Sequence, residues 1–213
     1  MTKIKICGLK RREDVEFISS LGVDYAGMIF VENVRRKINE IEAEEISNNI
    51  HNLNNPPKLV GLFADQPENY VIDIFNRYSL NYVQLCGNEN LDYLSRLGIP
   101  FIKQIKIGTN MNFKKICDQI DSIKELNGQV SLDTFKKGYY GGSGELINLS
   151  NAEKIVNKYE VFLSGGLNSD NIINIIESIH PWAVDVSSGV ETNNVKDKLK
   201  IEKFVNNIRS LKN

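Results

Sequence analysis

Strand-like and helix-like hydrophobic patterns alternate eight times along this chain, and this alternation limits its fold more than any other feature. Short apolar or period-two runs predict strands at residues 3–7, 25–30, 58–63, 82–85, 101–107, 129–133, 161–164 and 183–186. Helical patterns are expected at residues 12–21, 40–50, from 68, 90–97, 113–126, 151–158, from 168 or 169 to 179, and 200–211. Eight such units without a linker favour one α/β domain over residues 1–213, a (β/α)8 TIM barrel. A doubly wound open sheet is the alternative, because alternation alone does not show whether the sheet closes.

The composition restricts which cellular compartment and which classes of binding partner fit this chain. The 26 basic and 27 acidic residues nearly cancel, which argues against a nucleic-acid-binding surface. Cys7, Cys86 and Cys117 form an odd, widely spaced set, as expected in a reducing compartment, and none has metal-ligand spacing. The sequence has no signal-peptide pattern and no apolar run near about 18 residues. We therefore expect a soluble cytoplasmic protein without a metal site, a membrane segment or a nucleic-acid partner.

Polar residues recur on one face of several predicted strands. In the first strand Lys5 and Cys7 share a face, opposite Ile4 and Ile6. The same parity applies to three further pairs near strand ends: Gln84 with Cys86, Ser131 with Asp133, and Ala183 with Asp185. Since the apolar faces should pack on the helices, the polar faces should point into the barrel and gather at the carboxyl-terminal rim. Taken alone, Cys7 is more simply interpreted as a small buried packing residue, and each charge fits a structural ion pair equally well.

Glycine-rich loops follow the last three strands. Gly165 and Gly166 follow the seventh strand, Ser187, Ser188 and Gly189 follow the eighth, and residues 141–144 lie after the sixth. Backbone amides in such loops can bind an anion, and barrels often bind a phosphate between loops seven and eight. Arg36, between Arg35 and Lys37, is either part of a solvated basic turn or a bidentate clamp for a carboxylate.

These motifs, taken in order, resemble the phosphoribosylanthranilate isomerase family of tryptophan biosynthesis. The resemblance covers nearly the whole chain, and a matching motif lies at the end of nearly every strand. The matching segments are Lys5-Ile6-Cys7-Gly8, Gly61-Leu62-Phe63, Val83-Gln84-Leu85 with Gly87, Leu132-Asp133-Thr134, Gly141-Gly142-Ser143-Gly144, Leu163-Ser164-Gly165-Gly166-Leu167-Asn168, and Ala183-Val184-Asp185-Val186-Ser187-Ser188-Gly189-Val190-Glu191. The first motif and the last two together are the most specific.

The resemblance implies a cofactor-free Amadori rearrangement of N-(5-phosphoribosyl)anthranilate to 1-(2-carboxyphenylamino)-1-deoxyribulose 5-phosphate. It implies that Cys7 is the general base and Asp133 the general acid. It further implies that the substrate is bound by Arg36, Gln84, Cys86, Gly142 and Asp185, and its phosphate by Gly165, Gly166, Ser187 and Ser188. The implied partner is a small phosphorylated substrate, with the chain a monomer or a homodimer. A thiol acts as base only when ionised, so Lys5 is our candidate for lowering the pKa of Cys7.

Several positions depart from the family pattern. Cys86 stands where a His is usual, Val34 where a Ser is usual, Glu145 where a Lys is common, and Asn148 where an Asp is common. These positions belong to the binding shell, so they bear on substrate affinity and identity more than on reaction type. They also motivate one alternative, a phosphate-binding barrel that has lost catalysis. A second alternative is a Schiff-base sugar-phosphate aldolase that uses Lys5, Lys103 or Lys106.

Overall fold

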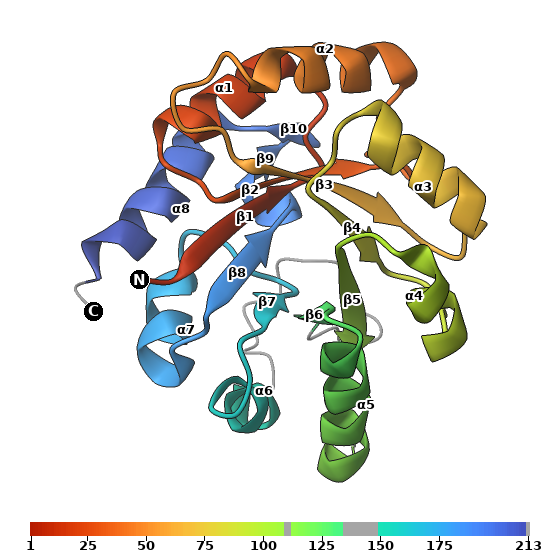
Figure 1. Ribbon diagram of the computed structural model, residues 1–213. Helices are drawn as coiled ribbons and strands as arrows, with labels where there is room; N and C mark the ends of the chain where they lie inside the picture. The colour runs from red at the N-terminus through yellow and green to blue at the C-terminus, as the bar shows by residue number, and fades with distance from the viewer. Residues whose placement is uncertain (109–111, 134–148, 212–213) are drawn as a thin grey trace.

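The computed structural model describes residues 1–108, 112–133 and 149–211, and its strands form a closed parallel barrel (Figure 1). The strands are β1 (Lys3–Cys7), β2 (Tyr25–Ile29), β3 (Lys58–Phe63), β4 (Tyr82–Leu85), β5 (Phe101–Lys106), β6 (Gln129–Asp133), β7 (Phe162–Ser164) and β8 (Ala183–Val186). Each strand pairs with the next, and β8 pairs with β1 in a register that sets Lys5 opposite Asp185. The expected (β/α)8 barrel is confirmed, and the open-sheet alternative is wrong.

Helices surround the barrel and connect successive strands (Figure 1). They are α1 (Arg12–Ser20), α2 (Glu40–Ile50), α3 (Glu68–Arg77), α4 (Leu91–Leu97), α5 (Phe113–Glu125), α6 (Leu149–Val156), α7 (Ile172–Ile179) and α8 (Lys198–Ser210). The side chain of Asn39 accepts from the amide of Glu42 in a capping box, as its position before α2 predicts. Within the three described ranges, no helix is long and apolar enough to cross a membrane.

Most element bounds agree with the sequence-based prediction to within two residues, and two local features differ further. Helix α7 begins at Ile172 rather than just after Asn168, because the Asn168 side chain accepts from the amides of Asp170 and Asn171 and so stabilises a turn. Between β8 and α8 the chain also forms a short 3₁₀ helix, Ser188–Val190, and a hairpin of β9 (Glu191–Thr192) and β10 (Val195–Lys196). Strands of two residues carry no periodic pattern, so periodicity could not predict this hairpin.

The core has two layers, which follow from the alternation within the strands. The outward residues pack under the helices, among them Ile4, Ile6, Val83, Leu85, Val130, Leu132, Val184 and Val186. The inward layer contains Tyr25, Val60, Leu62, Ile102, Phe162 and Ala183, with Cys7 at its upper edge. The Phe162 ring packs edge-on against Tyr25 and Trp182, with 5.1 Å between ring centroids in both pairs. Because Tyr25 and Phe162 begin their strands, aromatic rings fill the amino-terminal end of the barrel and polar groups remain for the other end.

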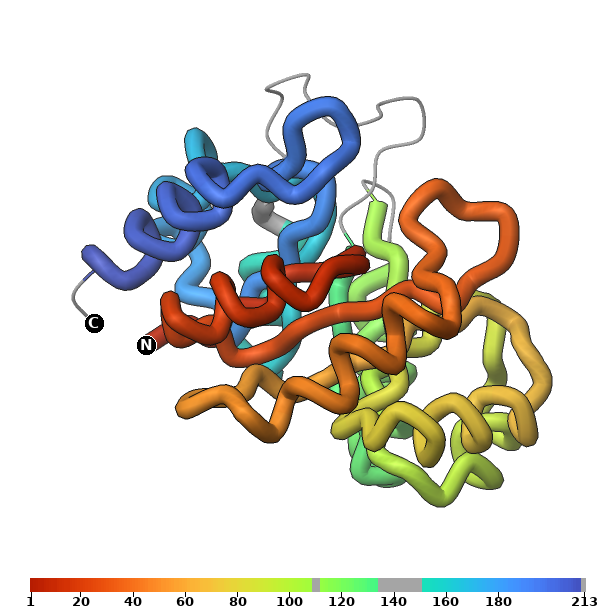
Figure 2. Tube along the Cα trace, turned by 90° about the horizontal axis from the view of Figure 1, so that it is seen from above, coloured from red at the N-terminus to blue at the C-terminus, as the bar shows by residue number. Residues whose placement is uncertain are grey.

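The two ends of the chain lie side by side. Figure 2 shows α8, in dark blue, next to α1, in red. The guanidinium of Arg209 in α8 donates to the carbonyl of Thr2 at 3.2 Å, just before β1. The last helix therefore covers the strand that begins the barrel.

Candidate active site

An inward-facing polar layer crosses the carboxyl-terminal half of the barrel. The strand registers align Asp133 with Ser164, Ser164 with Asp185, and Asp185 with Lys5. Lys5 is fully buried, and its Nζ donates to Asp185 Oδ2 at 2.7 Å. Burial by itself would lower the pKa of Lys5, but Asp185 and Cys7 outweigh it and the pKa is raised. The expected polar face is thus confirmed, and Lys5 is a protonated member of a buried ion pair.

Cys7 lies one inward position beyond Lys5 and is only 4% exposed. Burial raises the pKa of its thiol, while the positive charges of Lys5, Lys196 and Arg36 act in the opposite direction. Gly27 of β2 lies beside it, and a methyl group there would come within 3.0 Å of the Cys7 sulfur. The absence of a side chain at Gly27 therefore makes the room in which the thiol sits.

Asp133 ends β6 on the same inward face. Its Oδ2 accepts a hydrogen bond of 2.7 Å from Gln104 Nε2. Burial raises the pKa of the carboxyl group, and the negative charge of Asp185 adds to this. Lys106 and the Gln104 hydrogen bond oppose the shift without reversing it. A carboxylic acid of raised pKa is suited to give up a proton at the barrel mouth.

The other predicted binding residues on β4 and β8 face the same space. Gln84 Nε2 lies 3.7 Å from the sulfur of Cys86, whose pKa burial raises to about 12. The thiol of Cys86 is therefore protonated at neutral pH. Two buried polar atoms, Asp185 Oδ1 and Ser131 Oγ, have no hydrogen-bond partner among the described residues. Both are available to a bound substrate or water.

The loops after β7 and β8 touch each other. Gly165 and Gly166 have positive φ angles of 101° and 68°, which glycine adopts without strain. A side chain at Gly189 would overlap the carbonyl oxygen of Leu167, so the two loops approach at backbone distance. Ser187 Oγ donates to the carbonyl of Cys7 at 3.0 Å and ties loop eight to β1. Gly142, Glu145 and Asn148 lie outside the described residues.

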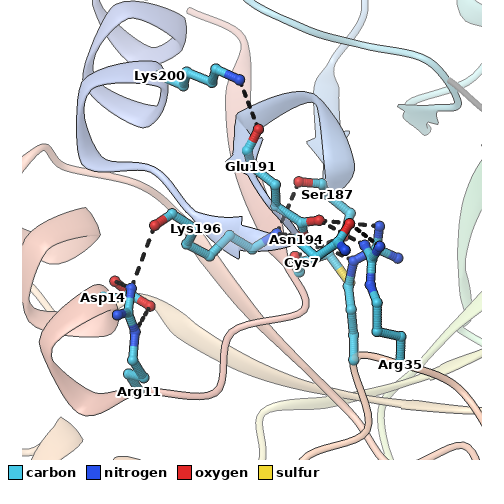
Figure 3. A network of polar contacts seen from close by, with 10 residues as sticks. Cys7, Arg11, Asp14, Arg35, Ser187, Glu191, Asn194, Lys196 and Lys200 are labelled. Carbon is cyan, nitrogen blue, oxygen red and sulfur yellow. Dashed lines mark hydrogen bonds and ion pairs between the residues drawn. The ribbon is translucent and has the colours of Figure 1, made fainter. Parts of the chain in front are cut away.

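Arg36 is held by a carboxylate that the sequence analysis did not single out. Its Nε donates to Glu191 Oε1 at 2.8 Å. Lys196 Nζ donates to the same oxygen at 2.8 Å (Figure 3). Burial would raise the pKa of Glu191, but these hydrogen bonds lower it. Arg36 is thus part of a charge cluster at the rim and no solvated turn residue.

Four residues of the site were missed by the sequence analysis: Gly27, Gln104, Glu191 and Lys196. Parity on the second and fifth strands could have found Gly27 and Gln104, because both share the inward face with residues of the barrel interior. Lys196 lies on the unpredicted hairpin and had no signal. In contrast, Lys103 points outward from β5 and pairs with Glu89, away from the barrel interior.

Comparison with known proteins places this geometry in a family. The family model described as "N-(5'phosphoribosyl)anthranilate (PRA) isomerase" matches residues 4–207. The chain belongs to the N-(5'-phosphoribosyl)anthranilate isomerase family. A family member from Dehalococcoides mccartyi is 36% identical over 98% of this chain and 96% of its own length.

Solved structures of the family agree with the fold. The isomerase from Thermotoga maritima superposes with a TM-score of 0.85 at 30% identity, covering 99% of this chain and 100% of that one. A second isomerase structure, in complex with reduced 1-(o-carboxyphenylamino)-1-deoxyribulose 5-phosphate, gives a TM-score of 0.82 at 29% identity over the same shares. The expected membership in an isomerase family is therefore confirmed.

Proposed function

We propose that this chain isomerises N-(5'-phosphoribosyl)anthranilate to 1-(2-carboxyphenylamino)-1-deoxyribulose 5-phosphate in tryptophan biosynthesis, with Asp133 as general acid and Cys7 as general base. The observation that carries the proposal is the placing of a carboxylic acid of raised pKa and a thiol near three cations at one barrel mouth. Such a pair has one proton to give and one group to receive a proton, as an aldose–ketose rearrangement requires.

In the first step Asp133 protonates the furanose ring oxygen, and the bond between this oxygen and C1 breaks to leave an iminium ion. Cys7, as thiolate, then removes the proton from C2, and the electrons of that C–H bond neutralise the iminium. The resulting enol becomes the ketone. One proton is given and one is taken, so the rearrangement needs no oxidant, reductant or cofactor.

The binding roles follow the charges at the rim. Arg36 would clamp the anthranilate carboxylate, because a guanidinium matches a carboxylate bidentately. The phosphate would bind the loops that carry Gly165, Gly166, Ser187 and Ser188. The unpartnered Oδ1 of Asp185 would accept a hydrogen bond from the substrate, with Gln84 and Cys86 lining the opposite wall. Gly142 keeps the substrate-binding role that the family resemblance implies.

The test generates the substrate in place from anthranilate and phosphoribosyl pyrophosphate and follows the loss of its fluorescence. We expect an active wild type, with Cys7→Ala and Asp133→Asn each lowering kcat by about 10²–10⁴-fold. Since an ionised Asp133 is unfavourable in its buried site, Asp133→Asn should have a Tm no lower than the wild type. An inactive but folded wild type that still binds the reduced product analogue would favour the catalytically lost barrel.

The aldolase alternative is tested separately by borohydride in the presence of a sugar phosphate. A Schiff-base lysine must be neutral to attack a carbonyl, whereas Lys5 is held protonated by Asp185 and Lys103 points away from the interior. We expect no covalent trapping. A trapped adduct on Lys5 or Lys106 would overturn the isomerase proposal.

A further inference from the structure

Three cations converge on the carboxylate of Glu191, which begins strand β9. Lys196 donates to Oε1 at 2.8 Å and Arg35 to Oε2 at 2.9 Å (Figure 3). Arg36 Nε also donates to Oε1, at 2.8 Å. The side chains of Glu191 and Lys196 are only 6% and 3% exposed. A carboxylate this well paired in a buried position is rigid, and it sets where its cations lie.

Glu191 occupies one edge of the Arg36 guanidinium. It accepts from Nε at 2.8 Å and from Nη2 at 3.4 Å, so both of its oxygens face the same side of the fork. Nη1 of Arg36 makes no hydrogen bond to a described residue. A guanidinium has five N–H groups in a fixed plane, so the edge formed by Nη1 and the second N–H of Nη2 is left for another carboxylate.

The Arg36 side chain also packs closely against Gly8. A methyl group at Gly8 would come within 2.7 Å of Arg36 Cδ and 3.2 Å of Ser187 Oγ. Gly8, with φ of 77°, follows directly after Cys7. The aliphatic part of Arg36 therefore packs against the backbone of Gly8, next to Cys7, and Glu191 holds its guanidinium.

Glu191 is itself anchored to the end of the barrel. Its carbonyl accepts from Lys200 Nζ at 2.7 Å, and Lys196 Nζ also donates to the carbonyl of Ser187 at 2.9 Å. The carboxylate thus connects loop two, which carries Arg36, to loop eight, which carries the predicted phosphate-binding serines. Without the Glu191 carboxylate, the Arg36 guanidinium would lose this link to loop eight.

We propose that Glu191 is a positioning residue for substrate binding: its carboxylate orients the Arg36 guanidinium so that the free edge meets the anthranilate carboxylate. This proposal rests on the proposed function, since it names the substrate group that Arg36 binds. Glu191 does not touch the reacting atoms and acts through Arg36.

The first test compares Glu191→Gln with the wild type in the fluorescence assay. Loss of the charge frees the guanidinium, so we expect KM to rise about 10-fold or more while kcat stays within about 3-fold. Glu32→Gln is the matched control, because Glu32 pairs with Lys37 on the exposed part of the same loop and should leave both constants unchanged. An unchanged KM for Glu191→Gln overturns the proposal.

A double-mutant cycle separates positioning from a general structural effect. In an Arg36→Met background, Glu191→Gln should raise KM by less than about 2-fold, because its route of action is already removed. An equal rise in both backgrounds would show that Glu191 does not act through Arg36. If the wild type were inactive on this substrate, the proposed function would fail first, so the two failures are distinguishable.

Discussion

Cys7 shows how a buried thiol depends on the charges around it. Burial raises its pKa, and Lys5, Lys196 and Arg36 bring it part of the way back. Parity in the sequence predicts that Lys5 shares a face with Cys7, and the structure agrees. Parity could not predict that Asp185, 180 positions away, neutralises much of the Lys5 charge, because barrel closure brings these two residues together.

The contribution of Lys5 is measured best without leaving a buried charge unpaired. We compare Lys5→Met/Asp185→Asn with the wild type, because either single change would leave the other member of the pair as a buried charge without a partner. If the thiolate is the base, the rate rises with pH through the pKa of Cys7. Lys5 lowers the pKa of Cys7 more than Asp185 raises it, so removing the pair should raise that pKa and move the rising limb of kcat/KM to higher pH.

Lys3→Met serves as the control for this pH profile. Lys3 lies over the Trp182 ring at the amino-terminal end of the barrel, with its Nζ 4.5 Å from the ring centroid, and should not move the limb. Coincident limbs for the double variant and the wild type would contradict the role of Lys5.

At the scale of elements, a buried ion pair joins the loops after β3 and β4. Lys103 Nζ donates to Glu89 Oε2 at 2.7 Å and to the carbonyl of Gly87 at 2.8 Å. Glu89 Oε1 in turn accepts from the amide of Asp65 at 2.9 Å. The side chains of Lys103 and Glu89 are 5% and 1% exposed. The turn that carries Cys86 is therefore held from outside the barrel.

Breaking this pair should be costly. We expect Lys103→Met to lower the free energy of unfolding by about 3–5 kcal/mol, because Glu89 would be left as a buried, uncompensated charge. Lys203→Met is the control, since Lys203 and Asp170 form an exposed, solvent-screened pair whose loss should change the free energy of unfolding little. Urea unfolding followed by circular dichroism measures both, and equal losses would show that burial of the pair has no energetic consequence.

The elements themselves were predicted unevenly. The bounds of β1, β3, β4, β6 and β8 match the sequence prediction residue for residue, because each is a short apolar or period-two run next to turn residues. The start of α7 was wrong because Asn168 caps a turn rather than the helix. The β9–β10 hairpin escaped prediction, and with it Lys196. A site built partly on elements of two residues cannot be read fully from periodicity.

Over the whole molecule, closure of the barrel depends on the two ends of the chain. β1 pairs with β8, and Arg209 of α8 donates to the carbonyls of Thr2 and Gly22 at 3.2 and 2.7 Å. Every one of these contacts joins residues about as far apart as the sequence allows. The sequence predicted eight strand–helix units, yet closure is a property of no single segment, which is why the open sheet remained an alternative until the structure was known.

Because the first and last elements lie side by side, joining the two ends and opening the chain elsewhere should leave the barrel intact. We expect a circular permutant, in which the two ends of this chain are joined by a short Gly/Ser linker and new ends lie between Asn54 and Asn55, to fold and keep its KM. These asparagines lie in an exposed polar turn, where the cut loses chiefly the hydrogen bond from Ser19 Oγ to the Asn55 carbonyl. A matched permutant opened between Gln104 and Ile105 would interrupt β5 and should not fold. Circular dichroism measures the folding of both permutants, and the fluorescence assay measures their activity. Loss of folding in the first permutant would contradict the expectation that the position of the chain ends does not matter for the barrel.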